Sequence, residues 1–256
     1  SVNESVNYPE KYFSNNVGSL ENIIDEIKLL ENPINFIFSS SCTVYGQADS
    51  MPIDESFPLK EAESPYGQSK RQCEEVLKSL HESGHSFKNI TLRYFNPIGA
   101  HPSALIGELP LGIPENLVPY ITQTAIGKRE CLTVFGDDYE TADGTCVRDY
   151  IHIMDLAEVH ITCLEKLISS NDDSFFKVYN VGTGKGTSVL ELINIFENVN
   201  DIKLNYKIGE RRKGDVVTAY ADTTKIKEEL NWSTKNSLRN ALKSAWNWEL
   251  NLNKDE

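Results

Sequence analysis

The sequence predicts an α/β protein in which a doubly wound parallel sheet is followed by a smaller α/β lobe. Short apolar runs without polar alternation, typical of strands covered on both faces, alternate with segments of helical periodicity. The order strand, helix, strand favours right-handed crossovers between parallel strands. With 256 residues, of which 39% are hydrophobic, the chain is long enough to bury a sizeable core.

The first part of the chain is predicted to supply the sheet. Apolar positions recur at helical spacing over residues 8–30, and the run NFIFSSS, residues 35–41, is typical of a buried strand. A helix is predicted to begin after Ser64, a good capping residue, with Pro in its first turn, and to continue to residues 83–84. A second strand, NITLRYFN, follows at residues 89–96.

After Asn96 the sequence becomes rich in Pro and Gly, which indicates the start of a second lobe. Its predicted elements are a helix at 117–126, a strand at 131–135, an extended segment at 147–152, a helix at 155–167, a strand at 177–181, a helix from Thr187 and a C-terminal helix with Leu238, Leu242, Ala245 and Trp246 on one face. We expect domains at 1–96 and 97–256, with residues of about 145–185 packing back on the first sheet.

Composition excludes several classes of function. The formal net charge of -13 argues against binding to nucleic acid or to an anionic membrane surface. No apolar run approaches the roughly 20 residues that a transmembrane helix needs. The five cysteines are widely spaced and lack a C-x-x-C pair, so they suggest no disulfide framework or zinc site, and a reducing cytoplasm is expected.

Two short motifs are interpreted as structural. His81 to His85 matches the zinc pattern H-E-x-x-H, which works only on a continuous helix, and Ser83 and Gly84 would fray the helix there, so no metal site is expected. The segment NVGTGKGTS, residues 180–188, has the spacing G-x-G-x-G rather than that of a dinucleotide-binding loop, and ordinary turn chemistry explains it.

Tyr66 and Lys70 lie four residues apart, so they share one face of the predicted helix. A free tyrosine has a pKa of about 10 and is a poor base at neutral pH unless a nearby positive charge favours its phenolate. Lys70 is able to supply that charge. From spacing alone, a chance pair on a solvated helix remains the alternative.

The surroundings favour the catalytic interpretation. Residues 39–41 and Thr43 place hydroxyl groups where one strand ends, and residues 94–96 follow the next strand. The carboxyl ends of parallel strands form the edge where open α/β sheets bind their ligands. Tyr66, at the start of its helix, is expected at the same edge.

Motifs along nearly the whole chain resemble the extended short-chain dehydrogenase/reductase family, and within it the branch of UDP-glucose 4-epimerases. They are NFIFSSSCTVYG, SPYGQSK, RYFNPIGAHPS, GIPENLVPYI, VFGDDYETADGTCVRDYIHIMDLA, YNVGTGKGTSVLEL and RRKGD. The resemblance implies a Rossmann-like domain that binds NAD, a UDP-hexose substrate and a reaction carried largely by the cofactor.

The resemblance also implies roles for residues. Tyr66 would take the proton of the sugar 4-hydroxyl, Ser41 would hydrogen-bond the same oxygen, and Lys70 would favour the phenolate and contact the nicotinamide ribose. The other implied cofactor contacts are Asn16, Ser39 and Tyr94. The implied substrate contacts, besides Ser41, are Thr43, Phe95, Asn96, Asn116, Leu117, Phe135, Arg148, Arg212, Asp215 and Ala219. For both arginines, a surface ion pair is the alternative.

Details of the match separate related activities. Dehydratases and decarboxylases that resemble this family usually carry an acidic residue after the serines, where this chain has Cys42 and Thr43, so an epimerase is favoured over those alternatives. Ala219 stands where some epimerases carry a bulky tyrosine. We therefore expect N-acetylated UDP-hexoses to be accepted as well as UDP-glucose and UDP-galactose.

The family begins with a strand, a Gly-rich turn and a helix that receive the cofactor pyrophosphate. The sequence contains no such segment, so we expect an N-terminally truncated Rossmann domain. The alternative function is that of an inactive remnant that binds nucleotide sugar. A homodimer, formed by the helices of residues 8–30 and of Tyr66, is the expected assembly of the intact protein.

Overall fold

The structure, a computed structural model, describes residues 2–30, 32–212 and 214–254. It divides into two compact units. The first contains the chain up to Tyr94, Val159–Val181 and Asp222–Ser233, and the second contains Phe95–Glu158, Gly182–Ala221 and the chain from Thr234 onward. Of the segment 145–185, residues 159–181 thus belong to the first unit.

The first unit combines the N-terminal elements of the chain with three elements from later segments. Its elements are α1 (Val2–Asn7), α2 (Pro9–Tyr12), a π-helical segment (Phe13–Gly18), α3 (Ser19–Ile27), β1 (Ile34–Ser41), a 3₁₀ turn (Cys42–Tyr45), α4 (Pro65–Glu82), β2 (Phe87–Tyr94), most of α6 (Ile153–Ser169), β7 (Phe175–Val181) and α8 (Thr224–Leu230). The helix expected over residues 8–30 is present as an uninterrupted helical run from Pro9 to Ile27, with a π-helical stretch in its middle.

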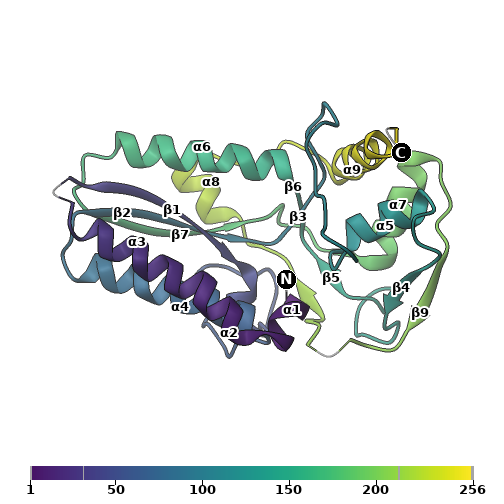
Figure 1. Cartoon of the computed structure of the whole chain (residues 1–256), viewed down its shortest axis with the longest axis horizontal. Helices are drawn as coiled ribbons and strands as arrows, with labels where there is room; N and C mark the ends of the chain where they lie inside the picture. The colour runs from purple at the N-terminus through teal and green to yellow at the C-terminus, as the bar shows by residue number, and fades with distance from the viewer. Residues whose placement is uncertain (1, 31, 213, 255–256) are drawn as a thin grey trace. The chain divides into compact units, whose positions relative to one another are not determined.

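The sheet of the first unit is parallel, in the order β1-β2-β7. Its register pairs Ser41 with Tyr94 and Tyr94 with Val181, so the three strands end together at one edge. Figure 1 shows α3 and α4 on one face of this sheet and α6 and α8 on the other. The doubly wound arrangement expected from the sequence is thus confirmed.

Helix α4 begins where its capping residue predicts. The Ser64 hydroxyl accepts a hydrogen bond from the Gly67 amide at 3.1 Å, and Pro65 occupies the first turn. Further along, Leu77 and Leu80 pack in a buried cluster with Leu20 of α3. This packing holds α4 against its neighbours and leaves its N-terminal turn beside the ends of the strands.

The second unit contains shorter strands and a helical core. Its elements are β3 (Asn96–Ile98), α5 (Leu117–Ala125), β4 (Leu132–Phe135), β5 (Val147–Arg148), β6 (Tyr150–His152), β8 (Thr187–Ser188), α7 (Val189–Asn200), β9 (Tyr206–Gly209), β10 (Thr218–Ala219) and α9 (Leu238–Leu252). The strands pair as β3-β6, β4-β9 and β10-β5-β8. Ile121, Phe196, Leu242 and Trp246 are buried together between the helices.

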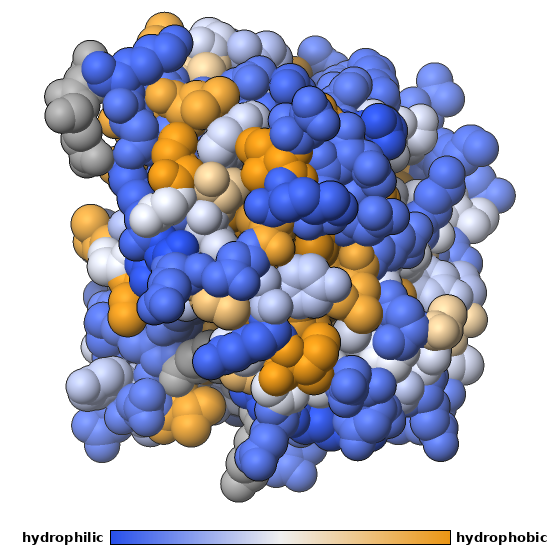
Figure 2. Space-filling view, turned by 90° about the vertical axis from the view of Figure 1, so that its right-hand side faces the viewer, coloured by the Kyte–Doolittle hydropathy of each residue, from blue (hydrophilic) through white to orange (hydrophobic). Residues whose placement is uncertain are grey.

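On the face shown in Figure 2, hydrophilic residues predominate and hydrophobic residues occur in separate groups. Among the described residues, no helix has both the length and the apolar character needed to cross a membrane.

Candidate active site

Tyr66 and Ser41 meet at the edge where the strands of the first unit end. Tyr66 lies in the first turn of α4, and Ser41 is the last residue of β1. Ser41 accepts hydrogen bonds from the Thr43 amide at 3.3 Å and from the Thr43 hydroxyl at 3.0 Å. Because its lone pairs are used in this way, the Ser41 hydroxyl hydrogen is available to the Tyr66 phenol, with which it forms a hydrogen bond.

The pKa of Tyr66 reflects two opposing effects. Burial raises the pKa above its usual value of 10.0, and the hydrogen bond from Ser41 lowers it by a smaller amount. Tyr66 is therefore protonated at neutral pH in the protein alone. Proton removal by this phenol needs additional positive charge beside it.

Lys70 lies near the phenol, but its hydrogen bond goes elsewhere. Its Nζ donates to the carbonyl oxygen of Ser39 at 2.8 Å, and it lies 5.0 Å from the centre of the Phe38 ring and 5.9 Å from that of Tyr66. Burial lowers the pKa of Lys70. The structure thus brings Tyr66, Lys70 and Ser41 together, with the ammonium near the phenol rather than bonded to it.

The residues expected to contact the cofactor lie in the same unit. The Tyr94 hydroxyl donates to the exposed Ser39 hydroxyl at 2.7 Å and lies 2.6 Å from Nε2 of His160. Asn16 lies against α4, where its side-chain amide donates to the Ser69 hydroxyl at 2.8 Å. Ser39 and Tyr94 therefore form one polar group at the sheet edge, whereas Asn16 is bonded to the helix that carries Tyr66.

In the second unit, the two predicted phosphate-binding arginines converge on one carboxylate. Arg212 donates to both oxygens of Asp215, at 2.6 and 3.1 Å, and Nη2 of Arg148 lies 3.9 Å from Asp215. The Arg212 guanidinium lies 5.5 Å from the centre of the exposed Phe135 ring. Two positive charges beside one negative charge leave this cluster with a net positive charge.

Ala219 belongs to the same part of the second unit. In the pairing of β10 with β5 it lies opposite Arg148, and its side chain is buried. Ala219 is therefore a neighbour of the arginine cluster.

The other predicted substrate contacts occupy separate places in the second unit. Phe95 is buried, and the Asn96 amide donates to the carbonyl oxygen of Asp149 at 2.9 Å. Asn116 precedes α5 and donates from Nδ2 to Glu108 at 2.6 Å, while Leu117 packs against the helical core. None of these four residues contacts Asp215 through a described hydrogen bond or ion pair.

The glycine-rich segment of residues 180–188 is held by a carboxylate of the chain itself. Both oxygens of the buried Asp149 accept hydrogen bonds there, from the amides of Thr183 and Gly184 at 2.8 and 3.0 Å and from the Thr183 hydroxyl at 2.6 Å. Loop amides that already bind a carboxylate do not form a phosphate cradle, which explains the structural role assigned to this motif.

The H-E-x-x-H motif does not lie on one continuous helix. α4 ends at Glu82, and His81 and His85 contact the hydroxyls of Ser174 and Ser83, both at 2.8 Å. Within residues 2–30, 32–212 and 214–254, no group of His, Cys, Asp and Glu side chains is arranged to hold a metal ion.

Sequence reasoning missed three residues that touch this site. His160 contacts Tyr94, the Ser5 hydroxyl accepts the Tyr66 amide at 3.1 Å, and Glu74 extends the helix face of Tyr66 and Lys70. Of these three, only Glu74 could have been found from the sequence, because it follows Lys70 by four residues and so shares its helical face.

A doubly wound sheet with a Ser-Tyr-Lys group at its carboxyl edge defines the extended short-chain dehydrogenase/reductase class. A family model described as GDP-mannose 4,6 dehydratase matches residues 1–245. The UDP-glucose 4-epimerase of Pasteurella multocida (strain Pm70) is 48% identical over 249 residues, which make up 97% of this chain and 72% of that relative. The chain therefore belongs to the UDP-glucose 4-epimerase family.

Solved structures agree with this assignment. The UDP-glucose-4-epimerase of Stenotrophomonas maltophila, with bound NAD and formylated UDP-arabinopyranose, matches at 40% identity with a TM-score of 0.94, over 100% of this chain and 75% of that one. The enzyme from Bifidobacterium longum, in complex with NAD+ and UDP, matches at 42% identity with a TM-score of 0.90, over 98% of this chain and 73% of that one.

Proposed function

We propose that this protein interconverts UDP-glucose and UDP-galactose by NAD-dependent oxidation and reduction at sugar C4. The Ser41, Tyr66 and Lys70 group at the sheet edge is the observation that carries the proposal, in a chain that belongs to the epimerase family. We assign NAD to the first unit and the UDP-sugar to the second.

The polar groups of the first unit fit the nicotinamide end of NAD. The Lys70 ammonium and the hydroxyls of Ser39, Tyr66 and Tyr94 lie at the carboxyl edge of a parallel sheet, and a ribose with two hydroxyls suits such donors and acceptors. When bound, NAD supplies the hydride acceptor and donor at C4.

The chain's own residues then handle the proton. The Tyr66 oxygen accepts the proton of the sugar 4-hydroxyl and later returns it, while Ser41 donates a hydrogen bond at the same place. Lys70 provides the positive charge that the phenolate requires. Because burial raises the pKa of Tyr66, this charge is essential at neutral pH.

The arginine cluster of the second unit is our candidate for binding the diphosphate. Guanidinium groups match paired phosphate oxygens, and the net positive charge around Asp215 supports this role for Arg148 and Arg212. Phe135, beside Arg212 and exposed, offers a flat ring for the uracil base.

The experiment that tests the function compares two tyrosines. Tyr66→Phe removes the proton-transfer group, so we expect kcat for UDP-galactose, with NAD added, to fall about 100-fold or more. Tyr206→Phe changes a tyrosine that is 41% exposed and outside the proposed site, and serves as the matched control. Full activity of Tyr66→Phe would contradict the mechanism. Absence of turnover in the unchanged chain, with UDP binding retained in calorimetry, would favour the inactive remnant.

We further propose that N-acetylated UDP-hexoses are substrates. The small side chain of Ala219, opposite Arg148 on the neighbouring strand, supports this proposal because a methyl group fills less volume beside the phosphate-binding cluster than a tyrosine ring. Ala219→Tyr is expected to lower kcat/KM for UDP-N-acetylglucosamine at least about 10-fold and to change that for UDP-glucose less than about 3-fold. Equal losses for both sugars would contradict a role in selectivity.

A homodimer in the cytoplasm is also proposed. Tyr8 and Ile23 are 61% and 47% exposed on the helical segment expected at the interface, which supports association through that surface. All five cysteines, which lie in the described part of the chain, are free thiols, as a reducing compartment requires. A purely monomeric species in analytical ultracentrifugation would exclude the dimer.

A further inference from the structure

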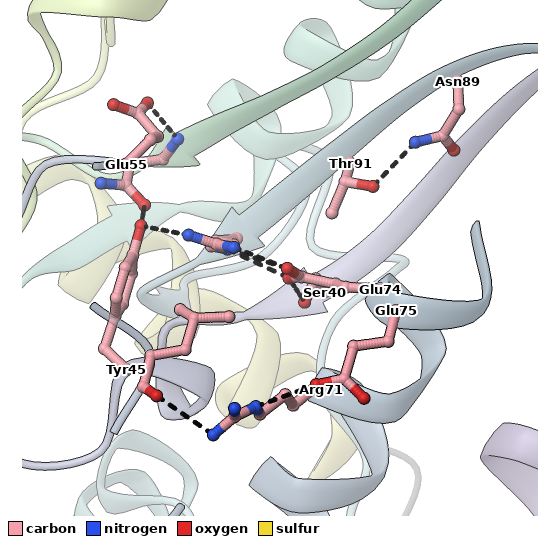
Figure 3. A network of polar contacts seen from close by, with 11 residues as sticks. Ser40, Tyr45, Glu55, Arg71, Glu74, Glu75, Asn89 and Thr91 are labelled. Atoms are coloured by element: carbon pink, nitrogen blue, oxygen red, sulfur yellow. Dashed lines mark hydrogen bonds and ion pairs between the residues drawn. The ribbon is translucent and has the colours of Figure 1, made fainter. Parts of the chain in front are cut away.

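A buried ion pair lies in the first unit, one helical turn beyond Lys70. Glu74 of α4 and Arg93 of β2 have side chains that are 7% and 6% exposed. Arg93 donates to both carboxylate oxygens, from Nη2 to Oε2 at 2.6 Å and from Nε to Oε1 at 3.0 Å. Figure 3 shows this contact beside the separate pair of Arg71 and Glu75 on the same helix.

The pair is part of a chain of hydrogen bonds across the sheet. Ser40 of β1 donates to Oε1 of Glu74 at 2.5 Å, and Nη1 of Arg93 donates to the Tyr45 hydroxyl at 2.9 Å. Tyr45 in turn donates to Oδ1 of Asn180, in β7, at 2.7 Å. One continuous network thus connects α4 to all three strands of the sheet (Figure 3).

Two residues of this network, Ser40 and Glu74, lie close in the sequence to the proposed reacting residues. Ser40 immediately precedes Ser41, and Glu74 follows Tyr66 and Lys70 at intervals of eight and four residues, on the same helical face. A shift of α4 along β1 would therefore change the distance of both Tyr66 and Lys70 from Ser41.

Stability alone does not account for this arrangement. Burying two charges removes their hydration, so a buried ion pair is often no more stabilising than apolar side chains of similar volume. A bidentate contact does fix the relative orientation of its partners, because both N–H groups and both oxygens must align. Glu74 also raises the pKa of Lys70, against the larger effect of burial, and so favours the charged ammonium.

We propose that Glu74 and Arg93 are positioning residues for the reaction: their ion pair fixes α4 against β1 and so sets the place of Tyr66 and Lys70 beside Ser41. This role rests on the proposed epimerase function. If the pair has this role, replacing both residues by apolar side chains lowers turnover even where the protein remains equally stable.

The test is a pair of variants in the full chain. Glu74→Gln leaves the Arg93 charge buried without its partner, so it is expected to lower both activity and thermal stability. The double variant Glu74→Leu/Arg93→Met removes both charges and is expected to recover much of the lost stability. Its kcat is nevertheless expected to remain about 100-fold low, because misplacement of reacting groups by about 1 Å has that effect.

The pair of Arg71 and Glu75 on the same helix is far less buried and provides the matched control. Arg71 and Glu75 are 29% and 60% exposed, with Nε and Oε1 at 3.2 Å. Glu75→Gln is expected to leave kcat and KM within about 2-fold of the unchanged protein, because exposed pairs of this kind contribute little. For the double variant, KM is expected to change far less than kcat, since the substrate is assigned to the second unit.

A second measurement does not depend on turnover. In the protein without nucleotide, the double variant is expected to exchange the amide hydrogens of Ser64 and of residues 66–70 about 10-fold faster than the unchanged protein, with α9 unaffected. Unchanged exchange, or wild-type kcat in the double variant, would overturn the positioning role. If the unchanged chain shows no turnover, the proposed function fails while the exchange measurement still decides this inference.

Discussion

Tyr66 is held by residues that are distant in the sequence. Its amide donates to the buried Ser5 hydroxyl at 3.1 Å, and its ring packs edge-on against Tyr12, with ring centres 6.1 Å apart. Amides in the first turn of a helix have no partner within the helix. Ser5 therefore acts as a cap supplied by another helix, alongside Ser64, and Tyr66 is anchored at its backbone and its ring.

The first prediction concerns this second cap. Ser5→Ala removes the acceptor of the Tyr66 amide, so we expect that amide to exchange about 10-fold faster and stability to fall by about 1 kcal/mol, as for other cap losses. Ser5→Thr keeps the hydroxyl and is the matched control. Hydrogen exchange followed by mass spectrometry measures the effect, and equal protection in the alanine variant would exclude the cap.

At the scale of the elements, the loop after β7 is held in its conformation by the carboxylate of Asp149. Asp149 binds the amides of Thr183 and Gly184, and it also accepts the Ala221 amide at 3.2 Å. A Cβ added at Gly182 would lie 2.4 Å from Oδ2 of Asp149. A glycine is required at this point because the carboxylate approaches the backbone so closely.

The second prediction follows from that approach. Gly182→Ala is expected to destabilise the protein by about 2–3 kcal/mol, because the added methyl group forces the carboxylate from its donors. Gly18→Ala is the control: its Cβ meets nothing within 4 Å and its φ is -60°, so a small gain in stability is expected. Urea unfolding measures the free energy of unfolding of both variants. Equal changes in Gly182→Ala and Gly18→Ala would contradict the close contact between Gly182 and Asp149.

At the scale of the whole molecule, buried ionisable groups determine how stability varies with pH. Burial raises the pKa of the Cys73 thiol from 9.0 to about 11 and that of Cys163 from 9.0 to about 12. Both side chains are 0% exposed. A raised pKa means that their stabilising contribution is complete below the unfolded pKa of 9.0 and is lost as the pH rises toward the folded value.

The third prediction is therefore a loss of stability in alkaline solution. Above about pH 9, each buried thiol is expected to reduce the free energy of unfolding by about 1.4 kcal/mol per pH unit. Unfolding by urea at about pH 8 and about pH 10 measures this slope. Replacing Cys73 and Cys163 by Ala is expected to flatten it, whereas Cys131→Ala, at a partly exposed position, is not. An unchanged slope in the double variant would contradict the assignment.

Much of the local structure could be predicted from the sequence. The cap at Ser64, the buried strand of β1 and the shared face of Tyr66 and Lys70 all depend on neighbours within a few residues, and each is present in the structure. Strand and helix order also predicted the parallel sheet. For Tyr66 and Lys70, spacing alone left a chance pairing open, and their proposed roles come from the resemblance to a family.

Other features depend on residues that folding brings together. The partners Ser5 and Tyr66 are 61 residues apart in the chain, Gly182 and Asp149 lie in different segments, and Glu74 meets Arg93 only because α4 packs on β2. Such contacts cannot be predicted from the pattern of neighbouring residues, because the periodicity of apolar residues indicates only which face of a helix or strand is buried. The sequence by itself therefore determined the elements, the family and the proposed catalytic pair, and the tertiary structure decided which groups hold that pair in place.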